Sequence, residues 1–266
     1  FAAQYCGAEV VPGNPLYPGR DVAELIRRTD AKMLIGLDVR LEPCTDALQE
    51  VSVDYLLVTS VRPHLPASLR AIYSLKTWLN GSIKVPAKTK LLRMESLYAR
   101  KAPPMEKSAS NDLDQVAVLQ PTGGTTGFPK LAMITHRNLI AQVCQNHAMA
   151  RHEPGTDVVL AVLPFFHVYG STVLMLSSVG GAATMVLFPR FEVRQLADAV
   201  EKYQPTALPL VPFMFKEFIA ELNRKPRKFQ RLGLVSSGAS AIDAETRDEF
   251  LEKTGAVVCE GYGLSE

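Results

Sequence analysis

The sequence lacks the cysteine pattern and the charge that mark several common classes of protein. Its four cysteines, Cys6, Cys44, Cys144 and Cys259, are far apart and form no CxxC pair, so neither a zinc site nor a disulfide framework is predicted. The formal net charge is only +2 and no polybasic tail is present, which argues against a nucleic-acid partner. Unpaired cysteines suit a reducing compartment, so we expect a cytoplasmic protein.

A long uninterrupted apolar run is also lacking. The most apolar stretch, residues 168–188, is broken by serines and by the pair Gly180-Gly181, which predicts a buried helix followed by a strand instead of a membrane span. No secretory signal is visible, and peripheral contact with a membrane stays open. The chain begins at Phe1 and stops at Glu266 directly after a glycine turn, so we expect both ends to continue in a longer protein.

What the sequence does contain is an alternation of short apolar runs and amphipathic helical patterns. Continuous apolar runs separated by helices predict an α/β fold, with parallel-rich sheets covered by helices on both faces. The length allows one large α/β domain or two smaller ones. We expect two subdomains, at residues 1–112, with a surface excursion at about 79–112, and at residues 113–266. Strands are expected at 31–36, 54–60, 116–120, 158–164, 183–188, 206–211, 232–237 and 256–261, and helices at 63–78, 136–150, 193–203, 212–222 and 243–254, the last with Asp243 as N-cap.

The segment TGGTTGFPK follows one of these predicted strands and precedes the helix expected from His136. Glycines allow a loop to aim several N–H groups at one anion, while threonine hydroxyls and a lysine add donors and positive charge. The segment therefore predicts a polyphosphate-binding loop, against the alternative of a flexible surface turn. It does not follow the Walker pattern. The residues concerned are Thr122, Gly123, Gly124, Thr125, Thr126, Gly127 and Lys130.

This loop resembles the phosphate loop of the adenylate-forming superfamily, which includes acyl-CoA synthetases, luciferases and peptide-synthetase adenylation domains. The usual form is (S/T)-(S/G)-G-(S/T)-T-G-x-P-K-G. Gly123 is similar to the fatty-acid branch, whereas Leu131 stands where the family usually has glycine. The resemblance implies the layered αβαβα-type N-terminal domain of these enzymes, here incomplete and without the C-terminal domain that carries a catalytic lysine.

Two further segments are similar to the motifs that bind adenosine in this superfamily. In GYGLSE, the resemblance implies that Tyr262, between Gly261 and Gly263, stacks on adenine, that Ser265 contacts phosphate and that Glu266, a hard oxygen ligand, holds Mg²⁺. Without the resemblance, a tyrosine capping a strand would be an equally good interpretation of Tyr262. In LVSSGASAI, the turn beside the adenine corresponds to Ser237, Gly238 and Ala239, with Ser240 where proline is common.

The segment LPFFHVYGS resembles the family segment between the ATP site and the acid pocket. His167 matches the position near the substrate carboxylate, against the alternative of a core histidine. We predict a pocket lined by His167, Val168, Gly170, Val211 and Phe213. Residues 163–191 contain no Asp or Glu to pair with a substrate ammonium, which argues against an amino-acid substrate. A medium- or long-chain fatty acid is the first expectation, and an aryl or cinnamic acid the second.

The resemblance implies ligation of an acid to coenzyme A, with ATP, Mg²⁺ and coenzyme A as cofactors or co-substrates and with Lys130, His167 and Glu266 as catalytic residues. Because the family's C-terminal lysine follows Glu266, we expect the fragment alone to bind nucleotide weakly and not to turn over. Two other classes stay open: a non-catalytic nucleotide- or lipid-binding relative, suggested by Leu131, and an unrelated phosphotransferase that would release ADP.

Overall fold

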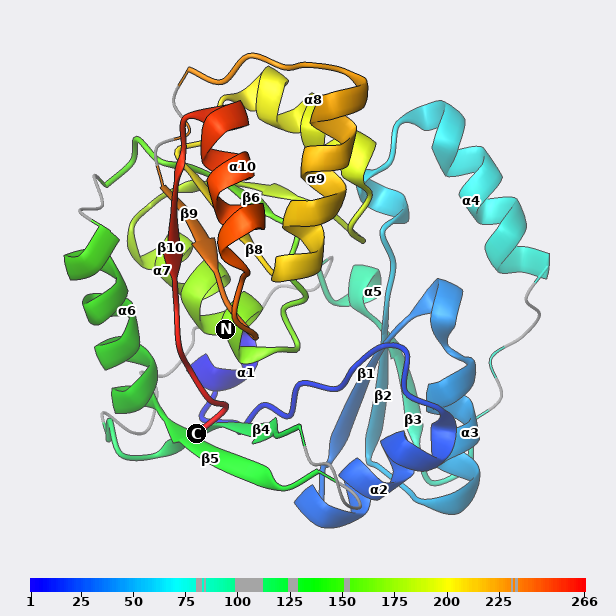
Figure 1. Ribbon diagram of the computed structural model, residues 1–266. Coiled ribbons are helices and arrows are strands. Elements are labelled where there is room, and N and C mark those ends of the chain that lie inside the picture. The colour runs from blue at the N-terminus through cyan, green and yellow to red at the C-terminus, as the bar shows by residue number, and fades with distance from the viewer. Residues whose placement is uncertain are drawn as a thin grey trace. The chain divides into compact units, whose positions relative to one another are not determined.

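The protein consists of two compact units, Phe1–Asn111 and Asp112–Glu266, each with its own parallel sheet (Figure 1). The structure is a computed structural model that describes residues 1–79, 83, 85–98, 112–123, 129–150, 154–230, 232 and 234–266. The α/β class predicted from the sequence is confirmed, because parallel strands alternate with helices in both units.

The first unit is built on a three-stranded parallel sheet with the order β1-β2-β3. The central strand places Leu56, Leu57 and Val58 in the interior, which explains its continuous apolar sequence. The elements are α1 (Ala2–Tyr5), α2 (Gly19–Thr29), β1 (Met33–Leu37), η1 (Asp38–Arg40), α3 (Glu42–Glu50), β2 (Tyr55–Thr59), η2 (Arg62–His64), α4 (Ala67–Leu79), β3 (Lys90–Arg93) and α5 (Met94–Tyr98).

Strand β3 lies inside the stretch that the sequence predicted as a surface excursion. It pairs in parallel with β2, and the buried Thr89 donates its hydroxyl to the carbonyl oxygen of Val53 at 2.9 Å. Its apolar core is only Leu91 and Leu92, flanked by Lys90 and Arg93, which is too short a run to predict a strand. The described part of this stretch therefore completes the sheet.

The second unit is built on a five-stranded parallel sheet with the order β10-β9-β8-β6-β7. All five strands coincide with predicted apolar runs, which is expected where a sheet is covered on both faces. Their bounds are β6 (Val158–Ala161), β7 (Thr184–Leu187), β8 (Ala207–Leu210), β9 (Leu234–Ser237) and β10 (Val257–Glu260).

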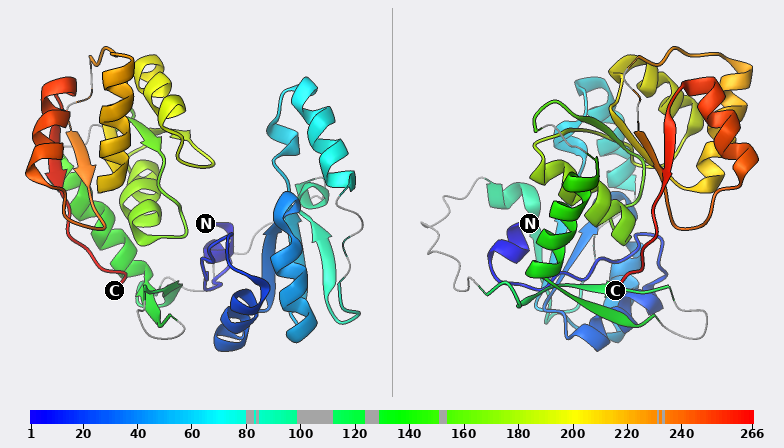
Figure 2. Two further views of the ribbon diagram at one scale, coloured as in Figure 1. Left: turned by 45° about the vertical axis from the view of Figure 1, so that its right-hand side comes forward. Right: turned by 60° about the vertical axis from the view of Figure 1, so that its left-hand side comes forward.

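Helices cover both faces of this sheet (Figures 1 and 2). With right-handed crossovers, the strand order places η3 (Tyr169–Leu176, a π-helix) and α7 (Ser177–Gly180) on one face, where α6 (His136–Ala150) packs on them. The other face carries α8 (Val193–Tyr203), α9 (Pro212–Arg224) and α10 (Ala244–Thr254). The predicted cap of α10 is confirmed: Asp243 accepts from the amide of Thr246 at 2.8 Å, and this hydrogen bond lowers the pKa of Asp243.

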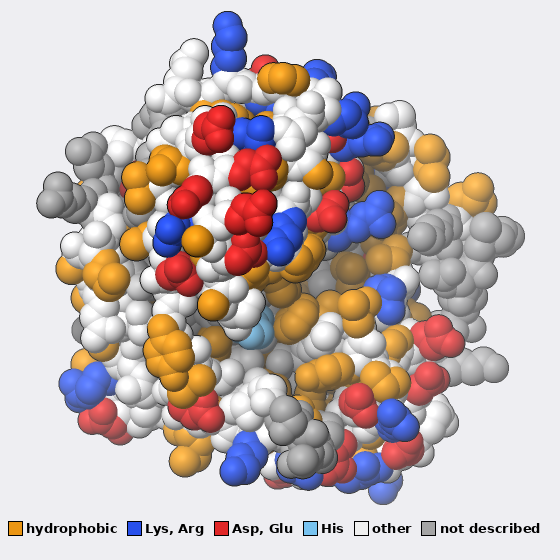
Figure 3. Space-filling model, in the orientation of Figure 1, with side chains coloured by type: hydrophobic (Ala, Val, Ile, Leu, Met, Phe, Trp, Pro, Cys, Tyr) orange, Lys and Arg blue, Asp and Glu red, His pale blue; other side chains and the backbone are white. Residues whose placement is uncertain are grey.

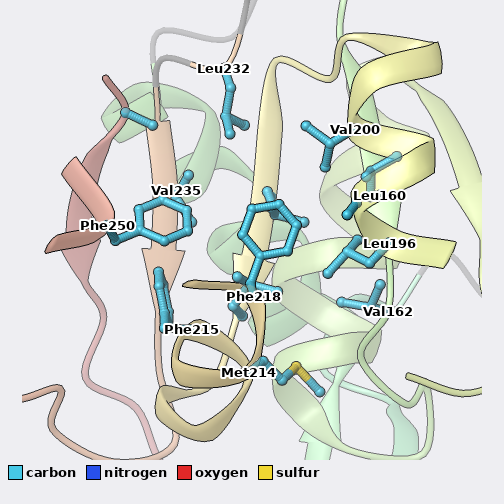
Figure 4. Packing of buried hydrophobic residues seen from close by; sticks show 14 of the residues in the cluster. Leu160, Val162, Leu196, Val200, Met214, Phe215, Phe218, Leu232, Val235 and Phe250 are labelled. Atoms are coloured by element: carbon cyan, nitrogen blue, oxygen red, sulfur yellow. The ribbon is translucent and has the colours of Figure 1, made fainter. Parts of the chain in front are cut away.

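The core of the second unit lies under α8, α9 and α10 (Figure 4). Phe215, Phe218 and Phe250 are fully buried, and the rings of Phe215 and Phe250 meet edge to face with centroids 4.9 Å apart. Leu196 and Val235 bring α8 and β9 into the same cluster.

The solvent side of these helices carries charges of both signs, which Figure 3 shows as interleaved Asp, Glu, Lys and Arg side chains. Examples are the ion pairs Lys216–Asp243 at 3.0 Å and Lys253–Glu249 at 3.6 Å. Over the part of the chain that the structure describes, every helix is too short or too polar to cross a lipid bilayer.

Candidate nucleotide and acid site

The two ends of the predicted phosphate loop are held by an antiparallel strand pair, β4 (Val116–Pro121) and β5 (Leu131–Thr135). The amide of Thr122 donates to the carbonyl oxygen of Lys130 at 2.8 Å and closes the base of the loop. Thr122 is half-buried and Lys130 is exposed. A Cβ placed on Gly123 would meet no atom of the described residues within 4 Å. Gly124, Thr125, Thr126 and Gly127 lie outside the described residues.

Strand β5 was not predicted: the helix expected from His136 does follow the loop, and this short strand lies between them. The loop joins two antiparallel strands, and Leu131 is the first residue of β5, where it pairs with Pro121. A leucine is well suited to a strand, and a glycine is not needed for this pairing. The short run LAMIT was not recognised because it directly precedes the helix.

Gln120 connects this strand pair to the five-stranded sheet. Its side chain is 4% exposed, and its Nε2 donates to the carbonyl oxygen of Phe166 at 3.0 Å. Phe166 belongs to the segment that follows β6 at the carboxyl end of the sheet. The base of the phosphate loop is therefore tied to the edge where open parallel sheets bind ligands.

His167 follows immediately in this segment, and its side chain is exposed. Its Nδ1 accepts a hydrogen bond from the amide of Tyr169 at 3.2 Å, which places the proton of the neutral ring on Nε2. An Nε2–H group is a suitable donor to a carboxylate. The predicted alternative, a buried core histidine, does not describe this side chain.

Gly170 explains how the segment turns from the sheet into η3. A Cβ at this position would overlap the backbone carbonyl of Pro164, so only glycine allows the two backbones to approach this closely. The neighbouring Val168 is half-buried and precedes the first residue of η3. π-Helical turns are frequent at functional sites.

Tyr169, which the sequence analysis did not single out, joins η3 to β9. Its hydroxyl lies 3.1 Å from the carbonyl oxygen and 2.9 Å from the Oγ of Ser236. Burial raises the pKa of Tyr169 to about 12, while the hydrogen bond to Ser236 opposes the rise. The ring lies against Gly238, where a Cβ would be 2.8 Å from Cε1. The sequence could have pointed to Tyr169, because it lies two positions after His167 in the same recognised segment.

The predicted adenine turn lies at the carboxyl end of β9. Ser237 is 1% exposed, and its Oγ is buried without a hydrogen-bond partner among the described atoms. Ala239 has a left-handed backbone with φ of 70°, a conformation of the kind that clusters at ligand sites. Gly238 donates its amide to the carbonyl oxygen of Leu210 at 3.3 Å, which joins the turn to the end of β8.

The segment after β10 lies beside this turn, because the amide of Gly261 donates to the carbonyl oxygen of Ser237 at 2.8 Å. Tyr262 is 93% exposed, so its ring is available for stacking and does not cap a strand by packing. Beyond Gly263, Ser265 is half-buried and Glu266 is exposed. In all the ribbon views the terminal segment runs to the β4–β5 pair (Figures 1 and 2).

Two predicted pocket residues lie after β8. Val211 is half-buried and precedes α9, whose first turn contains Phe213. Phe213 is 57% exposed and its ring meets that of Phe191 edge to face, with centroids 5.6 Å apart. These apolar groups thus lie at the same strand ends as the Gly238 turn.

Together these contacts gather the described parts of every predicted motif at one edge of the sheet. The chain belongs to the AMP-binding enzyme family, which matches it over residues 1–266.

Among curated relatives, the chain is 30% identical over 269 residues to a long-chain-fatty-acid–CoA ligase of Bacillus subtilis (strain 168), covering 100% of this chain and 48% of the relative. It is 25% identical over 273 residues to 4-coumarate–CoA ligase 4 of Arabidopsis thaliana, covering 100% and 44%. The chain therefore spans about half the length of these relatives.

The fold is similar to that of the luciferase-like enzyme from the mealworm Zophobas morio, with a TM-score of 0.77, 18% identity and coverage of 100% of this chain and 56% of that one. ATP-bound MatB from Rhodopseudomonas palustris gives a TM-score of 0.67 at 23% identity, with coverage of 100% and 46%. The predicted family and layered α/β architecture are confirmed.

Proposed function

We propose that the protein activates a carboxylic acid with ATP as an acyl-adenylate and then transfers the acyl group to coenzyme A. One observation carries this proposal: hydrogen bonds from Gln120 to Phe166, from Tyr169 to Ser236 and from Gly261 to Ser237 join the predicted phosphate, acid and adenine segments at one sheet edge. Family membership and the two CoA ligases among the relatives support it.

The described groups fit an adenine nucleotide. Tyr262 offers an exposed ring, Ser237 has a buried hydroxyl without a partner among the described atoms, and Lys130 adds a positive charge at the base of the loop. In this assignment Tyr262 and the turn of residues 237–239 hold the adenosine, while Thr122, Lys130 and the glycine-threonine loop hold the phosphates.

A Mg²⁺ ion at this site would be bound mainly through the phosphates of the nucleotide. Among the described residues no three His, Cys, Asp or Glu side chains form a cluster, whereas Mg²⁺ commonly uses one or two carboxylates together with substrate phosphates. Glu266 would be that carboxylate, and the ion would neutralise charge on the departing pyrophosphate.

In the first step the carboxylate of the acid attacks the α-phosphorus of ATP and pyrophosphate leaves. Both reactants are anionic, so positioning and charge neutralisation matter more than a general base. His167, with a proton on Nε2, would orient the carboxylate, and Lys130 would stabilise charge on the phosphates. In the second step the thiol of coenzyme A attacks the acyl carbon and AMP leaves.

We further propose a medium- or long-chain fatty acid as the substrate. Residues 163–191 contain no Asp or Glu, and the groups at this edge include Val168, Val211 and Phe213, which suit an apolar tail. An aryl or cinnamic acid is the second candidate, because 4-coumarate–CoA ligases are also among the relatives.

An acid panel tests both levels of the proposal. The longest natural protein that contains this chain would be assayed for AMP release with decanoate, palmitate, 4-coumarate and acetate, each with coenzyme A. We expect the highest kcat/KM with a fatty acid. A preference for 4-coumarate would replace the substrate and keep the reaction, whereas release of ADP would indicate a phosphotransferase. No acid-dependent AMP release in the parent, and none after Leu131→Gly, would favour a non-catalytic relative.

A further inference from the structure

Helix α4 of the first unit turns its polar side toward the protein. The hydroxyl of Tyr73 donates to Asp38 of η1, and the Oγ of Ser74 accepts from Nε of Arg62 in η2 at 2.7 Å. Tyr73, Ser74 and Thr77 are half-buried, in contrast to the exposed residues 66–72. A surface helix of a globular protein ordinarily places its apolar side on the core.

The apolar side chains of α4 point the other way. Leu69, Ile72 and Leu75 are 50%, 66% and 57% exposed and follow one another at intervals of three residues. At helical spacing such residues lie along one side, so they form a continuous exposed apolar stripe, called here the α4 stripe. Polar contacts fix the opposite side of the helix, so the stripe cannot be explained as a face turned to the core of its own unit.

The segment around the α4 stripe is basic. Between Val61 and Met94 the sequence contains no Asp or Glu, in a chain whose total charge is only +2. Arg62, Arg70 and Lys76 belong to η2 and α4 themselves. A basic amphipathic helix with an exposed apolar side is typical of segments that lie in the interface of an anionic membrane.

We propose that the α4 stripe docks on an anionic lipid bilayer. Leu69, Ile72 and Leu75 would enter the headgroup region, while the exposed Arg70 of the same helix contacts lipid phosphates. Charge complementarity selects this occupant: η2 and α4 contain basic residues and no Asp or Glu, which matches an anionic bilayer and disfavours a second copy of the same basic helix. The inference rests on α4 alone and does not depend on which acid the protein activates.

Binding would be measured by cosedimentation while the 266-residue chain is titrated with vesicles of phosphatidylcholine and phosphatidylglycerol. We expect binding that saturates as the vesicle concentration rises. Pure phosphatidylcholine should bind much more weakly, and added salt should weaken binding to the anionic vesicles.

Variants of exposed residues separate the apolar and the charged contributions. Ile72→Glu and Leu75→Glu should each lower the vesicle affinity by about tenfold or more, because they place a charge in the inserted stripe. Arg70→Gln should lower it by about fivefold, the effect of one basic residue near an anionic surface. Leu251→Glu on α10 is the matched control, since Leu251 is 44% exposed and the charge change is the same. It should bind like the parent.

Unchanged circular dichroism and unfolding midpoints would show that the variants fold. Equal binding to neutral and anionic vesicles would overturn the proposal, and so would full binding by Ile72→Glu and Leu75→Glu. If the parent ignores vesicles but forms a dimer that Ile72→Glu abolishes, the stripe belongs to an interface between two copies, and the lipid assignment is wrong.

Discussion

The face of the five-stranded sheet that lies under α8, α9 and α10 and the carboxyl edge of the same sheet use large apolar side chains in opposite ways. On the face, Phe215, Phe218 and Phe250 have no exposed surface. At the edge, Phe213 and Tyr262 are 57% and 93% exposed. The two sets of aromatic residues belong to the same unit and differ in whether the helices bury them.

Because of this difference in exposure, the buried rings contribute to the free energy of folding, whereas the exposed rings can contribute to the free energy of ligand binding. A ring that is already buried contributes to stability and has no surface left for a ligand. A ring that remains exposed contributes little to stability and can still gain by burial against a nucleotide base or an acyl chain. Substitutions on the face should therefore change stability, and substitutions at the edge should change binding and catalysis.

The largest effect is expected from truncating the face. Phe218→Ala should lower the free energy of unfolding by about 3–5 kcal/mol, because it removes buried apolar surface and leaves a cavity. Urea denaturation would measure this. Phe213→Ala makes the same chemical change at the edge and should alter stability by no more than about 0.5 kcal/mol. Equal losses of stability in the two variants would refute the separation.

The next largest effect is expected at the phosphate loop. In the longest natural protein that contains this chain, Lys130→Met should reduce acid-dependent pyrophosphate exchange by about 10²–10³-fold, the usual loss when one group that stabilises transition-state charge is removed. The unfolding midpoint should stay constant, since Lys130 is exposed. Lys225→Met, also an exposed lysine of the second unit, is the control and should keep full exchange. Normal exchange in Lys130→Met would remove Lys130 from the proposed mechanism.

The regular elements of the second unit could be predicted because their patterns are local. The predicted helices 136–150 and 193–203 match α6 and α8 at both ends, and five apolar runs correspond to the five strands of the sheet. Strands β3 and β5 escaped prediction because each is short: one is flanked by charged residues and the other directly precedes a helix. Pairing with a distant strand stabilises them, and this pairing cannot be inferred from the few neighbouring residues in the sequence.

Long-range contacts in the candidate site were also not predictable from the local sequence. Motif resemblance predicted Lys130, His167, Tyr262 and Glu266, because each stands within a short recognisable segment. It did not predict Gln120, whose contact with Phe166 spans 46 positions in the sequence. Contacts of this kind decide how the motifs are held together, and they depend on the folded arrangement instead of the local sequence.

Tyr169 gives the smallest expected effect and tests whether the face and the edge are coupled. Its hydroxyl binds Ser236 on β9 while its ring lies on Gly238 of the adenine turn. Tyr169→Phe should cost about 1 kcal/mol of stability, the typical net value of a hydrogen bond. Because the turn loses an anchor, KM for ATP should rise by about fivefold while kcat changes less.

Alkaline unfolding gives this prediction a second, independent measurement. The pKa of Tyr169 is raised from 10.0 to about 12 in the folded protein, so the protonated form is favoured by folding. Its contribution is complete below pH 10 and is lost as the pH rises to about 12. Over this range the free energy of unfolding of the parent should fall toward that of Tyr169→Phe, whereas Tyr203→Phe, an exposed control, should follow the parent. Parallel pH profiles for the parent and Tyr169→Phe would show that this hydroxyl is not buried in the folded protein.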